Sequence, residues 1–157
     1  MYSSGHWSAC HGRTGRVLAA SAVLVLVAAV AFAPRLEAGD GSWSPIGPAG
    51  AEVKAVAVSP GSSSTLVAGT SSGYSVTTNG GASWSPVTTG YETSAIVFDP
   101  SIASIVYAAT SAALARSSDS GATYVPVILE PTSCVAIDPA TPSTVYAGTM
   151  DHVYKST

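Results

Sequence analysis

The sequence has little charge and few of the residues that usually build a catalytic or metal centre. Charged residues make up 10% of the 157 positions, about half the usual share, and six Lys and Arg stand against nine Asp and Glu. The net charge of −3 excludes a broad basic face for nucleic acid. Two cysteines supply no disulfide framework, and P-loop, dinucleotide, zinc-ribbon and EF-hand patterns are absent, so we expect no cofactor or metal.

Glycine, proline, serine, threonine and valine are abundant instead. Fifteen Gly and ten Pro favour tight turns, and the β-branched residues between them favour short strands over helices. The hydrophobic share of 46% excludes a highly charged disordered chain.

One long apolar run lies near the start of the chain. Residues 17–33 carry no charge and follow Arg13 and Arg16, a pattern typical of a secretory signal peptide. Seventeen residues also reach the lower limit for a membrane anchor, so both alternatives stay open. We predict a signal or anchor at 1–33, a linker at 34–41 and an extracytoplasmic domain at 42–157 that meets the membrane only through its N-terminal segment.

The rest of the chain is a repeat. The block AVAVSP at 55–60 recurs as AIVFDP and CVAIDP, at offsets of 40 and then 39 residues. The block LVAGT at 66–70 recurs as VYAAT and VYAGT at the same offsets. Such constant spacing predicts three copies of one structural unit.

Each repeat is expected to form short antiparallel strands. The first block ends at a proline, which stops a strand, and the second is rich in β-branched and small residues. A third strand is predicted at 74–77 and 114–117, and a fourth at 83–87 and 123–127. Four strands in about 40 residues match one propeller blade, so we predict an all-β fold of about three blades after an N-terminal hydrophobic helix.

Two of the predicted turns resemble a known motif. TTNGGASW at 77–84 and SSDSGATY at 117–124 resemble the Asp box, S-x-D-x-G-x-T-W, of BNR-repeat propellers, a group that includes sialidase-like, Ycf48-like and xyloglucanase-like proteins. The first turn has Thr, Asn and Ser where the motif has Ser, Asp and Thr, and the second differs from the motif only by Tyr in place of Trp. The opening Trp43–Pro48 resembles the lead-in strand of such propellers, so the resemblance spans about residues 42–157.

The resemblance implies a structural role for the residues of these boxes. Asp or Asn accepts hydrogen bonds from backbone N–H groups, Gly permits a positive φ, and the aromatic is expected to be buried between blades. We assign no catalytic, cofactor or metal role to the box residues, which are Thr77, Asn79, Gly81, Ser83, Trp84, Ser117, Asp119, Gly121, Thr123 and Tyr124.

The expected strand count is low for a closed propeller. A lead-in strand, two full blades and three further strands give twelve strands, or at most three blades, against about 4–8 in known propellers. An open set of blades leaves an unpaired edge. Either the sequence is the front of a longer propeller, or the blades are completed by self-association, for instance by two chains that share a six-bladed ring.

Other candidates for chemistry also have structural interpretations. Gly69–Gly73 fits the G-x-S-x-G of a nucleophile elbow, but a hairpin is expected here where that motif needs a helix. His152 lacks a second ligand nearby and is predicted to be an exposed loop residue. Cys134 replaces an alanine of the other repeats and is expected to be a small buried filler. Asp99 and Asp138 both precede proline at the predicted turns.

Glycoside hydrolysis is the enzymatic alternative. Sialidase-like relatives use three arginines, whereas the predicted exported part has only Arg35 and Arg116. Xyloglucanase-like relatives need two carboxylates across a cleft, and Glu92 and Glu130 are the acids least explained by the repeat. We predict an exported, non-catalytic propeller module that binds a protein or a glycan or serves in assembly. The alternative is the N-terminal fragment of a glycoside hydrolase without a complete active site.

Overall fold

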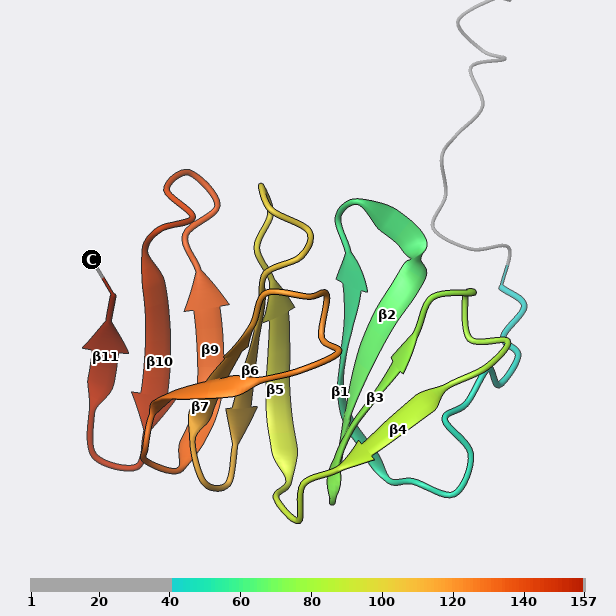
Figure 1. Ribbon diagram of the computed structural model, residues 1–157, viewed down its shortest axis with the longest axis horizontal. Helices are drawn as coiled ribbons and strands as arrows, with labels where there is room; N and C mark the ends of the chain where they lie inside the picture. The colour runs from blue at the N-terminus through green and yellow to red at the C-terminus, as the bar shows by residue number, and fades with distance from the viewer. Residues whose placement is uncertain (1–40, 157) are drawn as a thin grey trace, which may run out of the picture. The chain divides into compact units, whose positions relative to one another are not determined.

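The computed structural model describes residues 41–156, and these contain strands and turns but no helix. All strands lie in the unit Ser44–Thr157 (Figure 1). The predicted N-terminal hydrophobic helix falls outside the described residues, and within them no helix is long and apolar enough to cross a membrane. The strands are β1 (Val53–Ser59), β2 (Ser62–Thr70), β3 (Gly73–Thr77), β4 (Ser85–Thr88), β5 (Thr93–Phe98), β6 (Val106–Thr110), β7 (Leu114–Ser117), β8 (Val125–Ile128), β9 (Thr132–Ile137), β10 (Val145–Thr149) and β11 (Val153–Lys155).

The strands form three antiparallel sheets in chain order. The first sheet is β1-β2-β3-β4, the second is β5-β6-β7-β8, and the third is β9-β10-β11. The first strands of the three sheets lie next to one another, because β5 contacts both β1 and β9 (Figure 1). The predicted all-β fold is confirmed, and the arrangement is that of part of a β-propeller.

The three sheets pair their first two strands in one register. Matching residues face each other across these pairs, namely Val56 and Ala68, Ile96 and Ala108, and Val135 and Ala147. The pre-proline aspartates also occupy equivalent turns, where the backbone N–H of Asp99 donates to Ile105 O at 2.9 Å and that of Asp138 to Thr144 O at 3.0 Å. The sequence repeat is therefore a repeat of backbone structure.

The main hydrophobic core lies between the first and second sheets. Val67 and Tyr74 of the first sheet are buried with Phe98 and Val106 of the second. The ring of Tyr124 packs edge-on against that of Tyr74, with ring centres 4.6 Å apart. Each sheet is thus stabilised mainly by its neighbour, as expected for stacked repeats.

The expected lead-in strand at Trp43–Pro48 is wrong, since these residues form no strand and the described chain has eleven strands instead of twelve. Ile46 lies beside Gly81 of the first sheet, and its carbonyl accepts a 2.6 Å hydrogen bond from Trp84 Nε1. Val67 lies beside Gly121 in the same way at the next junction. Trp84 therefore packs against this segment, and not between two sheets as expected.

The expected burial of Cys134 is also wrong, because this cysteine is exposed. Ala95, at the equivalent position of the second sheet, is half-buried. Within residues 41–156 no fourth sheet follows to cover β9. Burial at this position depends on a neighbouring sheet.

Candidate functional site

The turn Ser117–Tyr124 is held by the side chain of Asp119. Its Oδ1 accepts from the Ser117 hydroxyl at 2.7 Å and from the Thr123 backbone N–H at 2.8 Å, and its Oδ2 accepts from the Thr123 hydroxyl at 2.5 Å. The Ser117 oxygen accepts in turn from the backbone N–H groups of Asp119 and Gly121, at 3.2 and 2.9 Å. These bonds use both carboxylate oxygens within the turn.

The turn Thr77–Trp84 repeats this network with an amide. Asn79 Oδ1 accepts from the Thr77 hydroxyl and the Ser83 backbone N–H, each at 2.9 Å, and Asn79 Nδ2 donates to Ser83 Oγ at 2.8 Å. The Thr77 oxygen accepts from Gly81 N at 3.0 Å. Gly81 and Gly121 have φ values of 90° and 91°, where a side chain is strained.

Hydrogen bonding lowers the pKa of Asp119 to about 2, from an ordinary value of 3.8. The largest cause is the Thr123 hydroxyl, followed by the Thr123 backbone N–H and the Ser117 hydroxyl. Because the folded-state pKa is depressed, the stabilisation is present above about pH 4 and is lost as the pH falls toward 2. Asn79 has no such titration.

We therefore expect Asp119→Asn to preserve stability at neutral pH and to flatten its acid dependence. Asparagine can make the bonds that Asn79 makes in the first sheet, but it cannot be protonated in this range. Thermal unfolding of both proteins between pH 7 and 2 measures this. Asp119→Ala is the control, because it removes the acceptors at every pH. If the unaltered protein and Asp119→Asn lost stability in parallel as the pH falls, protonation of Asp119 would not be the cause of the loss.

The acids considered for catalysis have structural contacts. Asp99 Oδ1 accepts from the backbone N–H groups of two following residues, at 2.7 and 2.9 Å, and Asp138 Oδ1 does the same at 2.9 and 3.2 Å. Glu130 accepts from the Tyr154 hydroxyl at 2.9 Å, and this bond raises the pKa of Tyr154. Glu92 lies 4.0 Å from the ammonium group of Lys54.

The remaining sequence candidates lie in hairpin turns. Gly69–Gly73 joins β2 directly to β3, so the strand-to-helix turn of a nucleophile elbow is not formed. His152 is exposed in the turn before β11, where its backbone N–H donates to Thr149 Oγ1 at 3.2 Å. Among the described residues, no group of three or more His, Cys, Asp or Glu could hold a metal ion.

The candidate binding site is a cavity of about 500 Å³ between the first and second sheets. Its wall is mainly apolar and includes Tyr74, Tyr124 and Ala108, while Tyr91 and Leu129 stand at its rim with 51% and 82% of their surface exposed. No sequence pattern identified this cavity, because its walls come from strands and loops of two different repeats.

Two of the residues that line this cavity have a buried hydroxyl group without a hydrogen-bond partner. Thr93 is fully buried, and within the described chain neither its Oγ1 nor the Tyr124 hydroxyl makes a hydrogen bond. Burial raises the pKa of Tyr124, so this hydroxyl stays protonated and can donate. A buried polar group without a partner costs about 1–3 kcal/mol.

The comparisons with known proteins support the propeller fold. One solved structure, of an ancestral GH74 enzyme, matches with a TM-score of 0.59 and 28% identity over 66% of this chain. Ycf48 from Cyanidioschyzon merolae matches with a TM-score of 0.57 and 18% identity over 69% of this chain. The chain spans only 17% and 35% of the length of these two proteins. No protein-family model and no curated relative matches the sequence.

Proposed function

We propose that this chain is an exported, non-catalytic β-propeller module of the Asp-box type that binds a protein or a glycan, and that the cavity between the first and second sheets is its binding site. The observation that carries the proposal is this cavity, whose mainly apolar wall includes Thr93 and Tyr124, two residues with unpartnered hydroxyl groups. A sugar ring or a protein side chain with an apolar face and a polar group has the matching chemistry.

The contacts of the acids support a non-catalytic role. A glycosidase needs one carboxyl group to protonate the leaving oxygen and another to act as nucleophile or base. Asp99, Asp119 and Asp138 instead accept hydrogen bonds from their own turns. Glu92 and Glu130 are not members of the cavity wall.

The second candidate function is a fragment of a glycoside hydrolase. It is favoured by the 28% identity to the ancestral GH74 enzyme, of which this chain covers 17%. Incubation with soluble xyloglucan, followed by an assay for new reducing ends, separates the two functions. We expect no product above that of the matched Glu92→Gln and Glu130→Gln variants. Product that either variant abolishes would favour the hydrolase.

We expect Thr93→Val to raise the free energy of unfolding by about 1 kcal/mol, because it removes a buried hydroxyl that has no partner and keeps the shape of the side chain. Thr132→Val is the matched control at the equivalent position of the third sheet. Its hydroxyl is also buried but donates to Glu130 O at 2.9 Å, so its removal should destabilise the protein. Chemical denaturation measures both, and a loss of stability in both variants would contradict the unpartnered state of Thr93.

The same variant tests binding. Methyl β-glucoside and p-cresol are suitable small probes for a sugar ring and a tyrosine side chain, and an NMR titration can follow the backbone amides of Thr93 and Tyr91. We expect one of the two probes to shift these amides in the unaltered protein and to do so more weakly in Thr93→Val. The absence of any shift with both probes at millimolar concentration would overturn the proposed site.

A further inference from the structure

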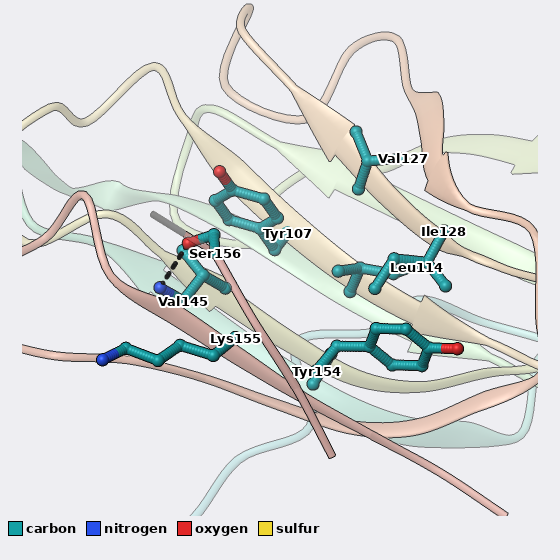
Figure 2. Close-up of a pocket in the computed structure, with 9 residues that line it drawn as sticks. Tyr107, Leu114, Val127, Ile128, Val145, Tyr154, Lys155 and Ser156 are labelled. Atoms are coloured by element: carbon teal, nitrogen blue, oxygen red, sulfur yellow. Dashed lines mark hydrogen bonds between the residues drawn. The ribbon is translucent and has the colours of Figure 1, made fainter. Parts of the chain in front are cut away.

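A second cavity, of about 360 Å³, lies between the second and third sheets (Figure 2). Tyr107, Leu114 and Val127 of the second sheet form one wall, and residues of β10 and β11 form the other, among them Val145 and Tyr154. The wall is mainly apolar. The outer strands of these two sheets are β8 and β11, and within the described chain each has a single partner, β7 and β10 respectively.

The repeat explains why this cavity exists. At the preceding junction, Tyr124 packs among Val67, Tyr74 and Val87. The residues one repeat further on are Tyr107, Leu114 and Val127, and all three line the second cavity. The cavity is therefore an aromatic-binding position of the repeat that no described residue of this chain fills.

The aromatic that fills such a position comes directly before a fourth strand. Trp84 precedes β4 and Tyr124 precedes β8, within the segments Trp-Ser-Pro-Val and Tyr-Val-Pro-Val. The third sheet has three strands and no such segment among its described residues. Its outer strand β11 offers free backbone groups, which can pair with an added strand.

The chain contains one more segment of this kind, Trp-Ser-Pro-Ile at 43–46. Trp43 is 95% exposed, and residues 43–46 belong to no strand. The proline of this segment lies ten residues before Ala55 of β1. The corresponding separations are nine residues for Pro86 and eight for Pro126, so the segment has the spacing of a fourth strand that precedes a first sheet.

We propose that residues 43–46 of a second copy of this chain pair with β11 and insert Trp43 into the cavity between the second and third sheets. The exchange is reciprocal, so two copies close a ring of six sheets, within the range of about 4–8 blades in known propellers.

The exposed faces of the first and third sheets support a second copy of this chain as the partner. Val56 and Val58 of β1 are 62% and 52% exposed on one end, and Tyr146 and Val153 are 38% and 78% exposed on the other. In the ring these two apolar faces meet. Trp84 then leaves Ile46 and packs over Tyr146 and Val153 of the second copy. Tyr124 packs in the same way over Val67 and Tyr74, which are the equivalent residues of the first repeat.

The mass of the full 157-residue chain in mild detergent tests the proposal, measured by sedimentation equilibrium with the detergent density-matched. We expect twice the one-chain mass of 15.6 kDa for the unaltered protein, and the one-chain mass for Trp43→Ala and for Val127→Asp. Val125→Asp is the matched control, because Val125 is 66% exposed on the same strand but does not line the cavity, and it should keep the double mass.

Mixing the variants makes the test sharper. Trp43→Ala lacks the inserted side chain and Val127→Asp has a damaged cavity, so a mixture restores one intact junction and should form a weaker two-chain species. A one-chain mass for the unaltered protein overturns the proposal, as does a double mass that both changes leave intact. If Val127→Asp loses the circular dichroism of the control, the Trp43→Ala mass decides alone, because Trp43 lies outside the sheets. Failure here leaves the proposed binding cavity between the first two sheets untouched.

Discussion

Replacing Tyr124 with alanine should lower the free energy of unfolding by about 3–5 kcal/mol, the usual cost of truncating a core aromatic. The ring lies in the core between the first and second sheets, 4.6 Å from the ring of Tyr74 and packed with Val67. Removing it opens a void at the junction through which the two sheets stabilise each other. Chemical denaturation followed by circular dichroism measures the change.

The control is Tyr124→Phe, which keeps the ring and removes only the hydroxyl. Since this hydroxyl has no partner within the described residues, its loss should leave stability unchanged or slightly increased. A cost below about 1 kcal/mol for Tyr124→Ala would show that the two sheets are not held by this ring.

The second large effect is expected for Gly73→Ala, at the start of β3. A Cβ at this position would lie 2.1 Å from the carbonyl oxygen of Val87 in β4, and the glycine has a φ of +152°. Backbone strain of about 1–3 kcal/mol and a comparable packing cost should together lower stability by about 3 kcal/mol or more. Thermal and chemical unfolding both report it.

Gly90→Ala separates the two causes. Gly90 has a φ of +80°, but a Cβ there meets no atom within 4 Å, so only the backbone cost of about 1–2 kcal/mol remains. Equal losses in the two variants would mean that β4 moves away freely and that the contact of Gly73 with Val87 has little influence on stability.

The repeat made most of the fold predictable from sequence. The proline that ends each first block predicts where the strand stops, and the β-branched and small residues of the second block favour a strand. These signals are local, and the three sheets accordingly share one register. The hydrogen bonds of Asp119 follow as well, because the turn places its donors within four residues.

The errors concern contacts between sheets, which no local pattern encodes. Cys134 has the sequence context of a buried residue, but its exposure depends on whether another sheet covers β9. Trp43–Pro48 reads as a strand, but a strand needs a paired neighbour to form. The cavity around Thr93 arises from the distance between two sheets, and its residues carry no motif.

The contact of Tyr74 with Tyr124 has a consequence for how such chains evolve. Each junction is specified by a hairpin of one repeat and a strand of the repeat before it, so a duplicated copy brings only half of every new junction with it. Substitutions that change the size of one of these rings should be compensated in the adjacent copy, and not within the same copy. Covariation in an alignment of homologues would then be strongest at a separation longer than the repeat itself.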